Sequence, residues 1–311
     1  MFFTTFLNAL PGAVAQGLIW GIMAIGVYIT YKVLDVADLT VDGSMCTGAA
    51  VCVMLMTNGC PMWLALLASL VAGMLAGLLT GIFHTIMGIP ALLAGILSQL
   101  SLYSINLKIL ADKANQPISW RNYYLLVSLN DVKSPPVAVK DGTLVFNPIF
   151  ITAILIAVII YLIYWFMGRE IGCALRATGA NQNMSRAQGI NTKFTTVLGL
   201  MMSNAIVAFS GALLAQYQGF ADINMGRGAI VIGLAAVIIG GVIFDKIFHN
   251  FALKLVSVAI GGIIYYIVLQ IVITLGFDTN LLKLLSAIVV GVFLAIPFWK
   301  KRFFTKVKGV K

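Results

Sequence analysis

Apolar runs of about 20 residues recur along the whole chain and are separated by short polar links. A helix needs about 20 mostly apolar residues to cross a membrane, and its backbone must be hydrogen-bonded internally in lipid. Of all residues, 61% are hydrophobic and only 10% are charged. We therefore expect residues 1–311 to form a single transmembrane domain, an all-α polytopic membrane helical bundle of about eight to ten transmembrane segments. The runs lie at 10–31, 36–57, 61–83, 88–110, 148–167, 194–216, 228–247, 251–274 and 281–298.

The basic residues are clustered rather than spread. The net charge is +10, and Lys and Arg gather in the segment 168–193 and in the tail 299–311. Because cytoplasmic loops of membrane proteins carry an excess of Lys and Arg, we expect a cytoplasmic insert at 168–193 and a basic cytoplasmic tail at 299–311. Clusters beside apolar runs favour membrane lipid as the surroundings, and we expect no nucleic-acid partner.

The longest polar link, residues 111–147, falls on the extracytoplasmic side by the same reasoning. It contains "VAVKDGTLVF", in which two short β-prone runs flank Asp141-Gly142. An Asp-Gly pair between such runs is typical of a two-residue β-hairpin turn. The hairpin either presents a surface to an extracytoplasmic partner or caps a gap between helices.

The segment "DLTVDGS" interrupts the second apolar run. Asp38, Thr40 and Asp42 alternate with apolar residues, which predicts extended backbone, and a helix then opens near Gly43 with Asp42 or Ser44 as its N-cap. A helix over 43–57 is too short to cross the hydrocarbon core, so we expect a broken or re-entrant helix near 36–57. Broken helices often build transport sites, but an interfacial loop that caps the second helix is the alternative.

Neutral polar side chains inside later runs extend this pattern. Gln99, Tyr103 and Asn106 share one helical face, and Asn204 lies within the run 194–216. They favour a polar translocation pathway, although interhelical hydrogen bonds would need the same residue types. The candidate pathway residues are Asp38, Thr40, Asp42, Ser44, Gln99, Tyr103, Asn106 and Asn204.

The chemistry of catalysis is missing from the sequence. The two histidines, His84 and His249, are isolated, and the four cysteines have no metal-site spacing. No G-x-x-x-x-G-K-[ST] motif occurs. We therefore expect a non-enzymatic chain that binds no cofactor or metal, with any ATP and Mg²⁺ bound by a separate subunit.

The central insert carries a resemblance to a known family. "ALRATGANQNMSRAQGI" resembles the cytoplasmic motif of ABC-importer permeases of the branched-chain amino acid and ribose class, approximately A-x-R-A-x-G-x-N-x-x-x-A-x-x-x-G-I. Ala180 and Ser185 depart from the usual acidic residue and alanine. "GRGAIVIGLAAVIIGGVIF" is similar to a helix of the same class. "DLTVDGS" and "GIPALLAGILSQLSLYSINLKI" look most like the permeases associated with uptake of aromatic amino acids, tryptophan or tyrosine. The matching motif positions are Ala174, Arg176, Ala177, Gly179, Asn181, Gly189 and Ile190.

The resemblance implies a multi-pass permease of the bacterial cell membrane. It would import a small solute, with an aromatic amino acid favoured. Its partners would be an ABC ATPase subunit that hydrolyses ATP, an extracytoplasmic substrate-binding lipoprotein, and a second permease copy, a homodimer being expected. The insert would be a coupling helix that docks on the ATPase.

Local sequence suits the coupling role. Asn181 can cap a short helix and Gly189 can end it, while Met184, Ala187 and Ile190 form a small apolar face. Arg176 and Arg186 offer charge to a partner. An ordinary basic loop is the alternative for the insert. For the whole chain, the alternatives are a stand-alone H⁺- or Na⁺-coupled transporter that uses Asp38 or Asp42, and a membrane scaffold or enzyme.

Overall fold

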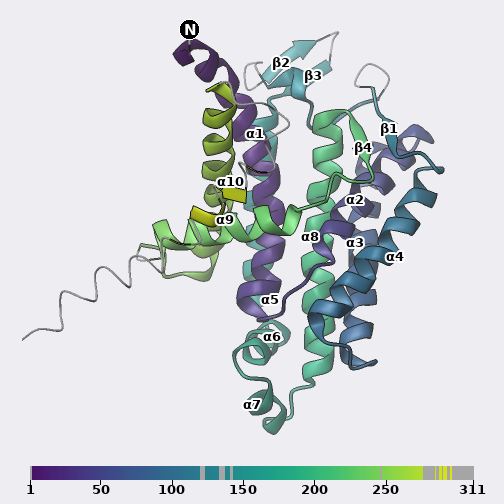
Figure 1. Ribbon diagram of the computed structural model, residues 1–311, viewed down its shortest axis with the longest axis vertical. Helices are drawn as coiled ribbons and strands as arrows, with labels where there is room; N and C mark the ends of the chain where they lie inside the picture. Colours follow the sequence, from purple (N-terminus) through teal and green to yellow (C-terminus); the bar gives the residue numbers. More distant parts are fainter. Residues whose placement is uncertain are drawn as a thin grey trace, which may run out of the picture.

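The chain folds into a bundle of long helices with two small strand pairs at one end (Figure 1). The computed structural model describes residues 2–119, 123–132, 137–140, 143–245 and 247–275, and isolated positions between 284 and 295. The helices are α1 (Phe2–Tyr28), α2 (Val41–Thr57), α3 (Met62–Thr85), α4 (Ala91–Ile109), α5 (Pro148–Met167), α6 (Glu170–Ala180), α7 (Gln182–Ala187), α8 (Thr192–Gln218), α9 (Ala229–Phe244) and α10 (Phe251–Thr274). A π-helical turn, Ile29–Val33, extends α1, and a 3₁₀ turn lies at Leu129–Asp131.

Within the described residues, six helices are long and apolar enough to cross a membrane, namely α1 with its π turn, α3, α4, α5, α8 and α10. Two shorter apolar helices, α2 and α9, accompany them. This confirms the predicted polytopic helical bundle and its break ahead of α2. The run at 281–298 and the tail at 299–311 lie almost entirely outside the described residues.

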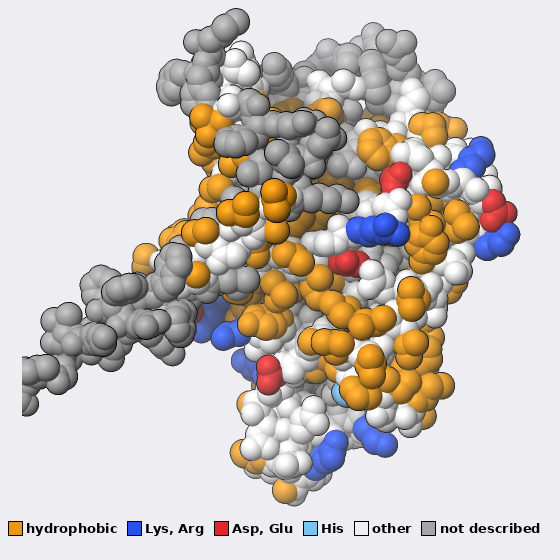
Figure 2. Space-filling model, in the orientation of Figure 1, with side chains coloured by type: hydrophobic (Ala, Val, Ile, Leu, Met, Phe, Trp, Pro, Cys, Tyr) orange, Lys and Arg blue, Asp and Glu red, His pale blue; other side chains and the backbone are white. Residues whose placement is uncertain are grey.

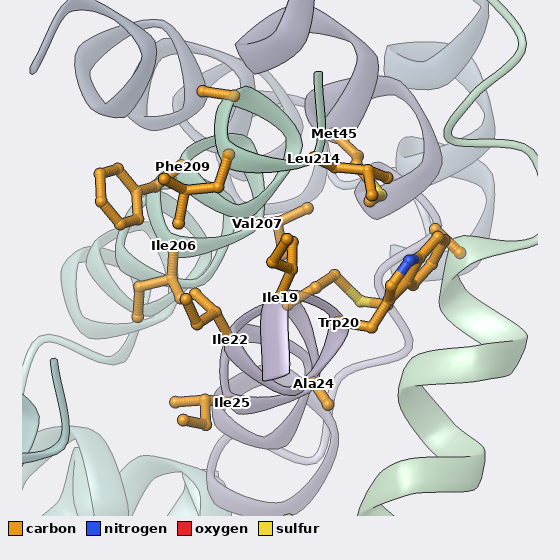
Figure 3. Packing of buried hydrophobic residues seen from close by; sticks show 14 of the residues in the cluster. Ile19, Trp20, Ile22, Ala24, Ile25, Met45, Ile206, Val207, Phe209 and Leu214 are labelled. Atoms are coloured by element: carbon orange, nitrogen blue, oxygen red, sulfur yellow. The ribbon is translucent and has the colours of Figure 1, made fainter. Parts of the chain in front are cut away.

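The core of the bundle is built around α1 and α8. In the most apolar stretch of α1, 83% of the residues are buried, and in that of α8, 72%. Ile19 and Ile22 of α1 lie beside Val207 and Ile206 of α8, and Met45 of α2 extends the same cluster (Figure 3). Helix α2, which borders the candidate site described below, packs on the interior helix α8.

Helix α2 packs on α8 with the two backbones in close contact. A Cβ on Gly48 would overlap the Ala208 carbonyl, and a Cβ on Gly211 would overlap the Met45 carbonyl oxygen. Small residues at helix interfaces allow such an approach in membranes, where packing rather than hydrophobic burial joins helices. The crossing therefore holds the short helix α2 tightly against α8.

The strands lie at the end of the molecule opposite α6 and α7 (Figure 1). β2 (Val137–Lys140) and β3 (Thr143–Phe146) pair antiparallel, with Lys140 opposite Thr143, where the sequence predicts a hairpin. The turn residues 141–142 lie outside the described residues. β1 (Asn115–Pro117) pairs antiparallel with β4 (Phe220–Asp222), a pairing that no local sequence signal announces.

The outer helices expose apolar side chains. Only 28% of the apolar stretch of α4 and 22% of that of α5 is buried. Hydrophobic side chains cover the face over α3 and α4, and Lys and Arg side chains lie both around the end that carries α6 and α7 and toward the upper right of the view (Figure 2). An apolar belt between charged ends is the surface that a membrane-spanning bundle presents.

Candidate functional site

The break between α1 and α2 is held by a buried carboxylate. Asp38 is only 3% exposed. Its Oδ1 accepts a hydrogen bond from the Thr40 backbone N–H at 2.9 Å, and its Oδ2 accepts one from Asn204 Nδ2 of α8 at 2.7 Å. Ser44 Oγ donates to Asn204 Oδ1 at 2.7 Å. Asn204 therefore joins the irregular segment to the first turn of α2.

A chain of hydroxyl groups continues this network into the next helices. Thr40 Oγ1 lies 2.6 Å from Thr80 Oγ1 of α3, and Thr80 Oγ1 donates to Ser98 Oγ of α4 at 2.8 Å. All of these side chains are buried. Of the predicted pathway residues, Asp38, Thr40, Ser44 and Asn204 thus lie in an interhelical hydrogen-bond network, the alternative that the sequence left open for Asn204.

The prediction that Asp42 or Ser44 caps α2 is wrong. Neither Asp42 nor Ser44 is the N-cap of α2; that position is Thr40, which makes no side-chain capping bond. The carboxylate of Asp42 instead accepts the backbone N–H of Gly228 at 2.9 Å and of Ile230 at 3.0 Å. It therefore caps the N-terminus of α9, because a carboxylate satisfies N–H groups that a helix start leaves unpaired.

The capped start of α9 borders a cavity of about 390 Å³. Gln99, Tyr103 and Asn106 of α4 all line this cavity, so the predicted polar face is brought together with Asp42. Asn106 is buried and donates from Nδ2 to the Gly43 carbonyl at 3.3 Å, while its Oδ1 accepts no hydrogen bond from any described residue. The described lining residues are Asp42, Gly43, Cys46, Gln99, Leu100, Tyr103, Asn106, Ile223 and Arg227.

Sequence reasoning missed Arg227 and Cys46. Arg227 sits in "MGRGAIV", a lone cation just ahead of an apolar run, which is a signal that could have marked it. It is exposed and lies in the turn that precedes α9. Cys46 follows Asp42 by one helical turn, so its position on the same face was also readable. The sequence does not show that both residues line the same cavity as α4.

The electrostatics of the cavity suit a small solute with an anionic group. Arg227 is the cation and Asp42 the carboxylate among its described lining residues. Both oxygens of Asp42 are already engaged by α9. The N-termini of α2 and α9 meet here, and the positive ends of helices near a cavity attract anionic substrate groups. No group of three or more His, Cys, Asp or Glu side chains able to hold a metal occurs among the described residues.

The central insert folds into two helices, α6 and α7, rather than one. Asn181 ends α6 and caps α7, accepting the Met184 N–H at 3.0 Å, and Gly189 ends the turn with φ +83°. The predicted cap and terminator are therefore both present. Met184 and Ala187 are exposed, and Ile190 is half-buried.

The arginines of the insert and its Gly179 make contacts with other parts of the chain. Arg176 Nη2 donates to the Met167 carbonyl at 3.0 Å, and Arg186 Nε donates to Thr192 Oγ1 at 2.8 Å. Gly179 packs against the backbone at Val33, where a Cβ would overlap the carbonyl oxygen. The insert thus contacts the π turn that directly precedes the break.

Comparison with known proteins identifies the family. The family model described as "Branched-chain amino acid transport system / permease component" matches residues 10–296. The chain belongs to this permease family. A tyrosine transport system permease protein of Clostridioides difficile (strain R20291) is 39% identical to this permease over 290 residues, covering 93% of this chain and 91% of the relative.

Other relatives are more distant or carry no assigned role. An uncharacterized protein of Rickettsia prowazekii (strain Madrid E) is 35% identical and covers 93% of this permease and 98% of its own length. A galactofuranose transporter permease protein of Escherichia coli (strain K12) is 28% identical, covering 55% of this chain and 48% of the relative. The solved structure of PsaBC from Streptococcus pneumoniae in complex with Fab matches 95% of both chains with a TM-score of 0.52 at 15% identity, which shows a shared fold.

The family and the apolar helices define what this protein is. It is the membrane permease subunit of an ABC importer and a multi-pass protein of the bacterial plasma membrane. It is a transport subunit rather than an enzyme. The family favours this role over a stand-alone ion-coupled transporter, and Asp38 already accepts two hydrogen bonds from its own chain.

Proposed function

We propose that this permease imports an amino acid, with an aromatic side chain favoured, through the cavity at the start of α9. The observation that carries the substrate class is the similarity to the tyrosine transport permease, at 39% identity over 93% of this chain. The similarity to the sugar permease of Escherichia coli is weaker and covers 55% of the chain.

The cavity has the groups that an amino acid needs. The Arg227 guanidinium would bind the α-carboxylate, since arginine presents paired donors that match a carboxylate. The side-chain oxygen of Gln99, which also lines the cavity, would accept a hydrogen bond from the α-ammonium group. Tyr103 and Leu100, which are 43% and 64% exposed, would contact the side chain of the substrate. The cavity volume of 390 Å³ lies toward the lower end of the ~300–1,000 Å³ range of ligand sites, as expected for a small solute.

Energy would come from subunits other than this chain. ATP and Mg²⁺ would bind a separate ATPase on which α7 docks, and a lipoprotein would deliver substrate at the opposite face of a permease homodimer. The exposed Met184 side chain, at 60%, suits a groove on such a partner. α7 follows directly on α6, whose Gly179 packs against Val33 just ahead of the break. The chain then runs through the break to Asp42, which caps α9. Movement of α7 would therefore reach the cavity.

The test is uptake of tyrosine by proteoliposomes that contain the permease, its ATPase and its binding lipoprotein. Uptake should require ATP, and leucine and ribose should compete poorly. Arg227→Gln should raise the substrate concentration for half-maximal uptake about 10- to 100-fold, the loss expected for a charged hydrogen-bonded pair. Lys108→Gln is the matched control, because Lys108 is 77% exposed and its ion pair with Asp112 lies at the surface.

Four outcomes would contradict parts of this proposal. Uptake of ribose in preference to tyrosine would reject the substrate class. An unchanged concentration dependence in Arg227→Gln would reject the cavity as the binding site. ATPase binding that survives replacement of residues 179–189 would reject the coupling role, and gradient-driven uptake by the purified chain alone would support the ion-coupled alternative.

A further inference from the structure

A second cavity lies far from the substrate cavity, at the end of α5 that adjoins α6. Its volume is about 700 Å³. It lies between the last turn of α5, the start of α6 and the link from α9 to α10, at the end of the molecule that the basic residues assign to the cytoplasm. Neither the substrate pathway nor the predicted coupling face of α7 explains it.

The charged side chains among the described lining residues of this cavity are both cations, Arg169 and Arg176. His249 lines the cavity beside them, and no Asp or Glu does so among its described lining residues. Neither guanidinium forms an ion pair with a described carboxylate. Arg176 uses one nitrogen on the Met167 carbonyl, which leaves other N–H donors of its planar group available. The cavity is therefore a basic site without an internal counterion.

The start of α10 adds to the same potential. Asn250 and Phe251 line the cavity, and Asn250, the N-cap of α10, makes no side-chain capping bond. The N-terminus of a 24-residue helix carries partial positive charge and unpaired N–H groups. The arginines, the histidine and this helix start together favour an anion, with phosphate oxygens fitting the planar guanidinium donors.

The α5 side of the cavity carries exposed aromatic and apolar side chains. Arg169 lies over the ring of Trp165 at 4.7 Å from its centroid, and Trp165 is 53% exposed. One turn earlier, Tyr161 and Leu162 are 67% and 55% exposed on the same outer helix. Aromatic residues at the end of an exposed apolar helix mark the membrane–water interface, and basic pockets between such helices suit lipid headgroups.

We propose that this cavity binds the headgroup of an anionic phospholipid of the cytoplasmic leaflet. Arg169 and Arg176 hold the phosphate, His249 and the start of α10 complete the polar end, and Trp165 and Tyr161 lie along the acyl chains. A free phosphate ion would meet the same cations but would gain nothing from the apolar side. The lipid connects α5 and α6 to the α9–α10 link.

The experiment measures how much lipid the full-length permease retains. The protein is purified in detergent, mixed with phosphatidylglycerol, phosphatidylcholine or inorganic phosphate, and studied by native mass spectrometry and thermal denaturation. We expect phosphatidylglycerol to be retained and to raise the denaturation midpoint, with no such effect from phosphatidylcholine or phosphate. Arg169→Gln should weaken retention about five-fold, the factor expected for one basic side chain at an anionic surface. His249→Gln, on a different segment, should weaken it as well.

Lys193→Gln is the matched control, because Lys193 is an exposed cation at the same end of the molecule but outside the cavity. It should leave retention unchanged. Equal retention in Arg169→Gln, His249→Gln and the wild type would overturn the proposal. So would an equal rise in midpoint with inorganic phosphate, which would make the cavity a site for the free ion. If Arg169→Gln and His249→Gln lose ATPase binding but retain phosphatidylglycerol, the cavity is a protein-docking surface instead.

Discussion

Asp42→Ala should loosen α9 more than any other single change at the cavity. The carboxylate of Asp42 accepts two backbone N–H groups from the first turn of α9. A hydrogen bond to a charged group contributes about 1.5–3 kcal/mol, and because Asp42 is partly exposed we take the lower value for each bond. The free energy of unfolding should fall by about 3 kcal/mol, which corresponds to a drop in Tm of roughly 6–12 °C at the sensitivity of a large domain.

The assay is thermal denaturation in detergent at a fixed scan rate, because irreversible unfolding makes Tm depend on that rate. Asp42→Asn should lose much of the same stability, since its amide nitrogen cannot accept the second N–H. Asp112→Asn is the control: that carboxylate pairs with Lys108 at the exposed surface, where an ion pair contributes about 0–1 kcal/mol. If Asp42→Ala and Asp112→Asn melt within about 2 °C of each other, the capping of α9 by Asp42 does not stabilise the fold, and the reasoning fails.

The same denaturation assay checks two further expectations. Gly48→Ala places a Cβ 2.6 Å from the Ala208 Cα, so overpacking should lower the free energy of unfolding by about 1–3 kcal/mol. A Cβ at Gly241 meets no described atom within 4 Å, so Gly241→Ala should be neutral or should stabilise the protein by up to about 1 kcal/mol. Equal melting of the two variants would contradict the close α2–α8 crossing. Asn204→Ala removes a hydrogen-bond donor from the buried Asp38 carboxylate and should lower the free energy of unfolding by about 3 kcal/mol or more. A variant as stable as the wild type would show that this network does not stabilise the fold.

Local sequence predicted the structure correctly wherever the interaction that decides it spans only one or two helical turns. Apolar runs fix the membrane helices because a lipid environment leaves the backbone no other partner. Asn181 and Gly189 bound α7 through contacts within their own turn. Gln99, Tyr103 and Asn106 line one cavity because helical periodicity alone puts them on one face. The insert motif is equally local, and it pointed to the family that the comparison confirms.

Tertiary structure decided what the polar side chains do. Asp38 and Asp42 stand four residues apart in similar surroundings, yet one joins a buried network with Asn204 and the other caps α9 at Gly228. Their partners lie 166 and 186 residues away along the chain. Likewise Arg227 reaches the cavity only because α9 begins against α2. A carboxylate accepts any N–H group that the fold brings to it, so its partner is chosen by how the helices pack and not by the residues beside it in sequence.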